Sequence, residues 1–331
     1  TVLFNLKRKE KMKIRGRRLK KILPIVMVIA LTFTSAPVNI ISSVTDSEAA
    51  NLSTVSAAST NDYGLADNIQ DGTILHCFDW KYSDIEAELP NIAAAGFTSV
   101  QTSPAQRDDT FGVWYMLYQP QSFSISTNAL GSKADLESLC KKADEYGIKV
   151  IVDVVANHTR GMDGENGPVA DNLKNRNFYR YNNKDSSQVD WRNRWEVITC
   201  NIGMRDLVSE NSELQGIIKG YLSELKSVGV DGIRWDAAKH IGLPSEGCNF
   251  WSTVTSDLGL YNYGEILEGP DDRESGNEGL MKEYTNYISV TDNGYGSTVM
   301  GTIRDGQVTT ENGKWVNKNA GITCLLYTSP S

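Results

Sequence analysis

Short apolar runs alternate along the chain with amphipathic stretches, starting near residue 73. Six runs have the length and composition of strands, at 72–80, 97–104, 148–158, 230–236, 260–266 and 286–291. The run IKVIVDVVANH at 148–158 is apolar almost throughout its first half, which is typical of a strand covered on both faces. Between the runs, apolar residues recur at helical spacing over 83–96, 132–147, 212–229 and 250–259, and each of these stretches ends at a glycine.

The regular order of strand, helix and strand predicts parallel βαβ units. Their number favours an α/β fold of the (β/α)8 TIM-barrel type, with about six strands present, over a doubly wound sheet. No GxGxxG sequence follows the first strand, which removes the usual dinucleotide-binding signature. About fifty polar residues rich in Gly, Asn and Trp separate the third strand from the next helix. Because this connection is too long for an ordinary loop, we expect a small inserted domain over 159–207.

The N-terminal part has the features of a secretory leader. Residues 1–21 contain ten Lys or Arg, an apolar run follows at 22–36, and the sequence Ser-Glu-Ala at 47–49 resembles a cleavage site. We therefore predict upstream residues and a signal peptide over 1–49, with Met12 as the candidate start. A membrane anchor is the alternative, but the apolar run is short for a full span and contains Pro24. Residues 50–65 are rich in Ser, Thr, Ala and Asn and are predicted to be a linker.

The boundaries of the barrel follow from the predicted insertion and from the C-terminal residues 324–331. The barrel is predicted over 66–158 and 208–323, and we expect it to be truncated before its last strands. The tail at 324–331, CLLYTSPS, fits no strand or helix pattern of this chain and resembles a translated sequencing adapter. We predict that it is not native sequence, with a genuine strand as the alternative.

Charge and cysteine content narrow the class of function. Outside residues 1–21 the chain has 23 basic and 40 acidic residues, so binding to nucleic acid through its phosphates is not expected. An acidic secreted protein of this kind suits a neutral polar ligand or a bound cation. The five cysteines are scattered, odd in number and without CxxC spacing, which predicts buried thiols rather than a disulfide framework or a zinc site.

Polar residues gather at the predicted C-terminal ends of the strands, where barrel enzymes have their active sites. Asp236 and Glu265 end two consecutive strands and should face one cavity. Arg234 lies two residues before Asp236, so both side chains share a face and can form an ion pair. The alternative is that Arg234 and Asp236 form a buried ion pair with a purely structural role. Two carboxylates in different environments are the groups that glycosidic cleavage requires, one as nucleophile and one as proton donor.

Three segments, DVVANH, GIRWDAAKH and GEIL, resemble short conserved regions of the α-amylase family, glycoside hydrolase family 13, over roughly residues 73–310. Within the family the chain resembles most the secreted bacterial α-amylases of the Bacillus subtilis type. The resemblance implies that Asp236 is the nucleophile, Glu265 the general acid/base and Arg234 the residue that positions the nucleophile. It further implies substrate-binding roles for residues around the scissile bond, namely Tyr118, Gln119, His158, Lys239 and His240. Asp153 is expected to support the site from below.

The resemblance also implies a structural calcium ion between the inserted domain and the barrel. Asn157 and Asp206 would supply side-chain oxygens and His240 its backbone carbonyl, and oxygen ligands of this kind suit Ca²⁺. The alternative for Asp206 is an N-cap of the helix that starts near residue 212. His76 has no role in these motifs and is expected to be a core histidine with its hydrogen bonds satisfied.

One element of the family pattern is missing. The family uses a third acid, an Asp after a His at the end of the seventh strand, and no His-Asp pair follows residue 265. The resemblance implies a secreted, retaining, endo-acting α-amylase that cleaves α-1,4-glucan, acts as a monomer and is not attached to a membrane after processing. A transglycosylase or branched-glucan hydrolase of the same family is the alternative. A non-catalytic glucan-binding relative is another.

Overall fold

A computed structural model describes residues 63–106, 113–161, 169–181, 184, 186–267 and 278–291, with three short strand segments between 308 and 327. The predicted leader lies outside the described residues. The linker predicted at 50–65 is described only from residue 63, and there Leu65 is already buried in the core. Within the described residues no helix is both long enough and apolar enough to cross a membrane.

The centre of the fold is a parallel sheet that contains all six predicted strands. Its parallel strands, in order across the sheet, are β1 (Ile74–Cys77), β2 (Ser99–Thr102), β3 (Lys149–Val155), β6 (Gly232–Asp236), β7 (Tyr261–Gly264) and β8 (Ser289–Thr291). The order of these strands across the sheet is therefore the same as the order of the six predicted runs along the chain. This is the strand order of an incomplete (β/α)8 barrel, as the sequence pattern predicts.

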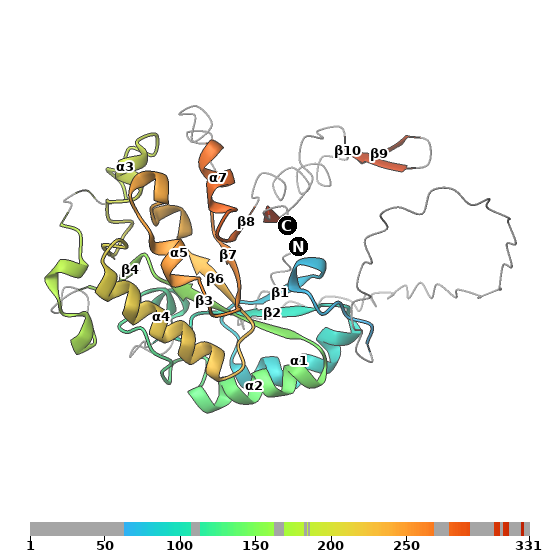
Figure 1. The fold of residues 1–331 in the computed structure, drawn as a ribbon. Coiled ribbons are helices and arrows are strands. Elements are labelled where there is room, and N and C mark those ends of the chain that lie inside the picture. The colour runs from blue at the N-terminus through green and yellow to red at the C-terminus, as the bar shows by residue number, and fades with distance from the viewer. Residues whose placement is uncertain are drawn as a thin grey trace, which may run out of the picture. The chain divides into compact units, whose positions relative to one another are not determined.

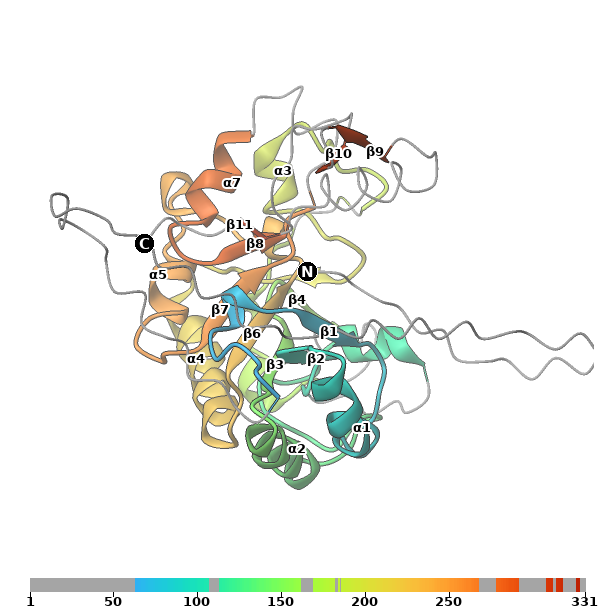
Figure 2. The same ribbon diagram turned by 90° about the vertical axis from the view of Figure 1, so that its right-hand side faces the viewer.

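Helices connect the consecutive strands and lie along one face of the sheet, as Figures 1 and 2 show. The α-helices are α1 (Tyr82–Ala94), α2 (Lys133–Glu145), α3 (Arg194–Val197), α4 (Ser212–Ser227), α5 (Phe250–Val254) and α7 (Glu278–Tyr284). Short 3-10 helices are η1 (Ile69–Asp71), η2 (Trp114–Tyr118), η3 (Asp171–Leu173), η4 (Arg176–Phe178), η5 (Ala238–His240) and η6 (Pro244–Glu246). In Figure 2 the helices α1, α2, α4 and α5 follow one another around the outside of the strands.

Local sequence explains where these helices begin and end. Ser132 and Asp135 form a reciprocal capping box at the start of α2. The α5 helix is shorter than the predicted stretch 250–259 and ends at Val254. The hydroxyl of Thr255 donates to the carbonyl of Trp251 at 2.6 Å, and Asp257 has a φ of 65°. The backbone N–H of Thr255 donates to the same carbonyl, so its hydroxyl adds a second bond at the last turn. A left-handed residue such as Asp257 cannot continue a right-handed helix.

The two faces of the sheet have different chemistry. Side chains that point toward the helices are apolar and belong to the main core, as Val152 and Val154 of β3 and Trp235 of β6 do. Side chains of the opposite face alternate with them, and among these are Asp153 and Arg234. Because successive strand residues point to opposite faces, one apolar face holds the helices while the other can carry polar groups.

The long connection after β3 begins and ends at a pair of short strands. β4 (His158–Thr159) and β5 (Arg205–Asp206) run antiparallel, with His158 opposite Asp206. The start and the end of the predicted insertion therefore lie side by side near the end of β3. The boundaries of this insertion as a domain stay a prediction.

Additional short strands occur beyond residue 300. β9 (Val308–Glu311) and β10 (Lys314–Asn317) form an antiparallel pair, and β11 (Leu326–Tyr327) pairs antiparallel with β8. The sequence pattern predicts none of these three. The pairing of β11 agrees with the strand alternative for the tail, whereas the origin of residues 324–331 stays a prediction.

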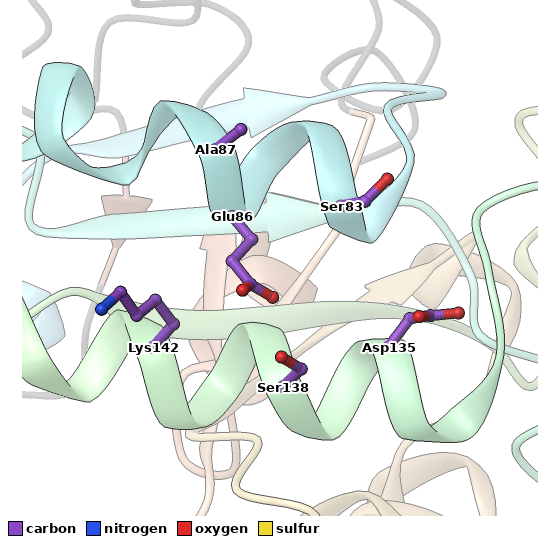
Figure 3. Close-up of a pocket in the computed structure, with 6 residues that line it drawn as sticks. All are labelled: Ser83, Glu86, Ala87, Asp135, Ser138 and Lys142. Atoms are coloured by element: carbon purple, nitrogen blue, oxygen red, sulfur yellow. The ribbon is translucent and has the colours of Figure 1, made fainter.

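A shallow polar groove lies between α1 and α2, on the helical side of the sheet. Figure 3 shows its lining, with Glu86 of α1 and Lys142 of α2 facing the same space. Both helices lie away from the polar face that carries Asp153 and Arg234. The groove is therefore separate from the candidate active site.

Candidate active site

Arg234 of β6 holds three carboxylates together at the ends of neighbouring strands. Its Nη1 lies 2.8 Å from both carboxylate oxygens of Asp153 on β3 and 2.8 Å from Oδ1 of Asp236. Its Nη2 lies 2.9 Å from Oε1 of Glu265, just beyond β7. The strand register causes this meeting, because Asp153 is the direct partner of Arg234 and Asp236 lies two residues further along the same face. The predicted pair of Arg234 and Asp236 is confirmed, and it is part of a larger cluster.

The three carboxylates of the cluster differ in how far their side chains are exposed to solvent. The side chain of Asp153 is fully buried, whereas 14% of Asp236 and 27% of Glu265 are exposed. Burial raises the pKa of Asp153, and Arg234 opposes that rise. Burial alone would lower the pKa of Arg234, but the three carboxylates raise it well above its usual value, Asp153 most strongly. Asp153 therefore lies beneath the cluster, as expected, and Asp236 and Glu265 are the two acids that a ligand can reach.

Backbone geometry places Glu265 beside Asp236. The backbone N–H of Ala237 donates to Oε2 of Glu265 at 3.2 Å, and Ala237 has a left-handed φ of 51°. Such a conformation is unusual for alanine and occurs most often at functional sites. Gly264 makes the close approach possible, because a Cβ there would lie 2.7 Å from both Ala238 and Ile288. Ala237 and Gly264 lie within the motifs GIRWDAAKH and GEIL, but the motifs alone do not indicate these backbone contributions.

Tyr118 and His158 lie at the edge of this cluster. The hydroxyl of Tyr118 donates to Oδ2 of Asp153 at 2.9 Å, and Nε2 of His158 donates to the carbonyl of Tyr118 at 3.0 Å. Burial lowers the pKa of His158, whereas the charge of Asp236 opposes this shift. The Tyr118 ring also stacks on Phe78 at 6.1 Å between centroids. Gln119 follows directly and ends η2, where its backbone N–H donates to Met116.

Lys239 and His240 lie on η5, directly after the strand that carries Asp236. Nζ of Lys239 donates to the carbonyl of Leu267 at 2.7 Å, and Nδ1 of His240 donates to the carbonyl of Val197 at 2.7 Å. The His240 ring also packs edge to face with Trp191 at 5.8 Å between centroids. Burial lowers the pKa of His240 to about 4. The structure therefore brings both predicted residues to the rim of the carboxylate cluster, between β7 and the insertion.

Asn157 and Asp206 are buried side by side through the pairing of β4 and β5. The backbone N–H of Leu207 donates to the carbonyl of Asn157 at 2.9 Å. Asp206 is 1% exposed, and burial raises its pKa well above the usual value, against the opposing charge of Arg180. Nε of Arg180 is 3.0 Å from Oδ2 of Asp206. Even so, within the described part of the chain neither carboxylate oxygen has a well-aligned hydrogen bond.

One alternative and one expectation about single residues are wrong. Asp206 is not the N-cap of the helix that follows, because Asn211 caps α4 with its side chain on the N–H groups of Glu213 and Leu214. His76 is not a histidine with satisfied hydrogen bonds, because its buried Nε2 has no partner among the described residues. Burial and then the nearby charge of Arg234 lower the pKa of His76 to about 4. The His76 side chain lies on the polar face of the sheet, next to Gln101 on the neighbouring strand. On this face it lies within reach of the charge of Arg234.

A curled parallel sheet with acids gathered at its strand ends defines a protein of the (β/α)8-barrel class with a site for acid/base chemistry. The sequence of the chain matches a family model described as the catalytic domain of alpha amylase over residues 83–275, and the chain belongs to the α-amylase family. That region includes Asp153, Arg234, Asp236 and Glu265. The resemblance predicted from the short motifs is therefore confirmed at the level of the family. The closeness to the Bacillus subtilis type stays a prediction.

Two relatives with curated names are α-amylases. The α-amylase of Clostridium acetobutylicum is 36% identical over 267 residues, which cover 75% of this chain and 34% of that protein. The α-amylase of Butyrivibrio fibrisolvens is 30% identical over 277 residues, which cover 73% of this chain and 28% of that protein. The chain thus spans about a third of the length of these relatives.

Solved structures of similar fold include amylases and glucanotransferases. α-Amylase I of Eisenia fetida, in complex with maltohexaose, has a TM-score of 0.58 at 22% identity and covers 73% of this chain and 52% of that one. The gamma-cyclodextrin glucanotransferase of an alkalophilic Bacillus clarkii has a TM-score of 0.60 at 21% identity, covering 73% and 42%. At this identity the likeness concerns the fold.

Proposed function

We propose that the chain carries the catalytic machinery of a retaining, endo-acting α-amylase that hydrolyses α-1,4-glucosidic bonds of starch and related glucans. The observation that supports this most strongly is the arrangement of Asp236 and Glu265 around one guanidinium. Both acids are partly exposed, and both are held in place by Arg234. A glycosidase needs one carboxylate that attacks and one carboxyl group that donates a proton.

The contacts of each acid favour one division of roles. Arg234 hydrogen-bonds Oδ1 of Asp236, which fixes the position of this carboxylate and leaves Oδ2 as the oxygen that attacks the anomeric carbon. Glu265 gives its proton to the leaving oxygen as the bond to that oxygen breaks. The donors from Ala237 and Arg234 then stabilise the carboxylate that forms. In the second step Glu265 takes a proton from water, and the water displaces Asp236 from the sugar.

Tyr118 is suited to hold the sugar whose bond is broken. Its hydroxyl is fixed by Asp153 and its carbonyl by His158, so the ring has a defined orientation at the rim of the cluster. Aromatic faces pack well against the apolar faces of sugars. Gln119 and His158 lie beside it. Lys239 and His240 are on the side of Glu265, where the leaving part of the glucan would lie.

The proposed calcium ion would be held by Asn157, Asp206 and the carbonyl of His240. The chemistry of the donors fits such an ion, because Asp206 has two buried carboxylate oxygens without well-aligned hydrogen bonds among the described residues. Asn157 is buried directly before β4, whose partner strand carries Asp206, and Arg180 pairs with one of the two carboxylate oxygens. A hard cation accepts oxygen ligands of this kind and would offset the burial of Asp206. Among the described residues no group of three His, Cys, Asp or Glu side chains could bind a metal, so the amide and the carbonyl are needed. The ion would tie the insertion to the barrel.

Secretion and chain length belong to the same proposal. The predicted leader at 1–49 and the acidic composition of the rest support an extracellular, monomeric protein that acts on a neutral glucan. Because the relatives are about three times longer than the matched region, we propose that this chain is part of a longer protein that also supplies the third acid. Comparing the starch hydrolysis of the 331-residue chain and of the complete reading frame tests this point. Full activity of the 331-residue chain alone would contradict it.

Hydrolysis of maltohexaose by the full-length protein tests the function itself. We expect Asp236→Asn and Glu265→Gln each to lower kcat by several orders of magnitude with little change in the folded state. Asp171→Asn is the matched control, because its side chain is 96% exposed on the insertion and the substitution should leave kcat unchanged.

The anomer that is released, followed by NMR, tests the stereochemistry. Release of the α-anomer supports retention. Release of the β-anomer contradicts it, and longer oligosaccharides among the products would indicate a transglycosylase.

A further inference from the structure

Arg194 of α3 joins the insertion to the segment 237–246, which follows the strand of Asp236. Its Nε lies 2.7 Å from Oε1 of Glu246, and its Nη2 lies 3.0 Å from Oε2 of the same side chain. Its Nη1 donates to the backbone carbonyl of Lys239 at 2.5 Å. Only 14% of the Arg194 side chain is exposed. One guanidinium thus binds this segment at Lys239 and at Glu246, and the first four residues of the segment belong to the motif GIRWDAAKH.

Tyr284 of α7 holds the same segment from the other side. Its hydroxyl accepts from Nη2 of Arg194 at 2.7 Å and donates to the carbonyl of Ile241 at 2.7 Å. Tyr284 is 1% exposed, so these bonds lie in the interior. Next to it, Glu283 accepts from the backbone N–H and the hydroxyl of Ser245 at 3.1 and 2.6 Å. The segment is therefore fixed between the insertion and the helix α7.

The segment contacts Glu265 and carries two of the predicted substrate-binding residues. The backbone N–H of Ala237 contacts the Glu265 side chain, and the N–H of Lys239 donates to the Glu265 carbonyl at 3.3 Å. Lys239 and His240 occupy the middle of the segment. If the Lys239 carbonyl moved, these two side chains would move with it, whereas Asp236 is fixed separately by Arg234 within the sheet.

We infer that Arg194 is a positioning residue, which sets the Lys239–His240 segment for the sugar units on the leaving side of the scissile bond. This inference rests on the proposed function. Arg194 itself does not reach the substrate and acts through the carbonyl of Lys239. A buried ion pair with Glu246 alone would contribute little net stability. The two further bonds, to the Lys239 carbonyl and to Tyr284, are what fix the geometry of the segment.

Two substrates separate positioning from a general structural role. Maltohexaose places sugars on both sides of the scissile bond, whereas 2-chloro-4-nitrophenyl α-maltotrioside has an aryl leaving group and no sugar on the leaving side. In the full-length protein we expect Arg194→Met to lower kcat/KM for maltohexaose by on the order of tenfold to a hundredfold, mainly through KM. The aryl substrate should change by less than about threefold, because Asp236 and Glu265 keep their arginine. Arg194→Lys, which keeps the charge but not the planar fork, should lie between wild type and Arg194→Met.

Arg176→Met is the control, since Arg176 is an exposed arginine of the same insertion. An equal loss on both substrates would mean that Arg194 only supports the fold and would overturn the inference. Unchanged kinetics on both would overturn it as well.

Amide hydrogen exchange gives a readout that does not depend on activity. In Arg194→Met the amides of 237–246 should exchange at least about tenfold faster, while those of 149–155 keep their rate. A uniform increase, or none, contradicts the inference. If the wild-type protein hydrolyses neither substrate, the proposed function fails, and the exchange pattern still decides whether Arg194 positions the segment.

Discussion

Replacing Arg234 by methionine should destabilise the fold mainly through one residue, the buried Asp153. Methionine has a similar length but no charge, so the three carboxylates lose their shared cation. Asp236 and Glu265 are partly exposed and can be hydrated by water. Asp153 is fully buried and loses both of its bonds to Nη1 of the arginine. A buried charge left without its partner costs about 3–5 kcal/mol.

This cost should depend on pH in a defined direction. Burial already raises the pKa of Asp153 above its usual value, and Arg234 opposes that rise. Without Arg234 the folded-state pKa rises further, while the unfolded-state pKa stays near about 3.9. The folded variant then binds a proton more tightly than the unfolded chain, so its stability increases as pH falls. The difference from wild type should therefore be largest above pH 7 and smaller near pH 5.

Urea unfolding followed by tryptophan fluorescence measures the effect, since Trp235 is fully buried next to Arg234. Arg234→Met should lose about 3–5 kcal/mol at pH 8 and clearly less at pH 5. The double variant Arg234→Met/Asp153→Asn should recover more than half of the loss, and it remains measurable if the single variant does not fold. Arg176→Met should change little. A loss that is the same at both pH values, or no recovery in the double variant, would refute the reasoning.

Three further predictions concern single positions. Gly264→Ala should cost about 1–3 kcal/mol of unfolding free energy, because its Cβ would lie 2.7 Å from Ala238 and Ile288, and an unchanged urea midpoint would contradict this. Ser132→Ala should cost about 1 kcal/mol through loss of the α2 cap, measured in the same way, and a change below about 0.3 kcal/mol would refute that role. His76 should titrate near pH 4 by NMR, since burial lowers its pKa to about 4, and its contribution to stability should be lost as pH falls from about 6.5 toward 4. An NMR titration of His76 with a midpoint near about pH 6.5 would contradict this prediction.

The sequence alone predicts the order of strands and helices with good accuracy. Each of the six apolar runs becomes a strand of the parallel sheet, because alternation of strand and helix allows few other arrangements. The motif at 231–240 also predicts that Arg234 and Asp236 share a face, which follows from the period of two along a strand. The periodicity over 250–259 predicts too long a helix, because it does not reveal that Asp257, within this stretch, is left-handed.

The composition of the site could not be predicted in the same way. Arg234 binds Asp153, 81 residues away, and Glu265 on the next strand, and only the strand register determines these contacts. Among the described residues the buried Nε2 of His76 has no hydrogen-bond partner, and burial together with Arg234 lowers its pKa, which no pattern near residue 76 indicates.

What the sequence determined by itself is therefore the six parallel strands, the helices α1, α2, α4 and α5, the family and the acids at the strand ends, since these depend on local spacing and on short motifs. What only the tertiary structure decided is which charges share one guanidinium, which backbone N–H supports Glu265, and how Arg194 of the insertion holds the Lys239 carbonyl. These contacts join residues far apart in the chain. Their strength depends on burial, and burial exists only when the sheet, the helices and the insertion are packed together.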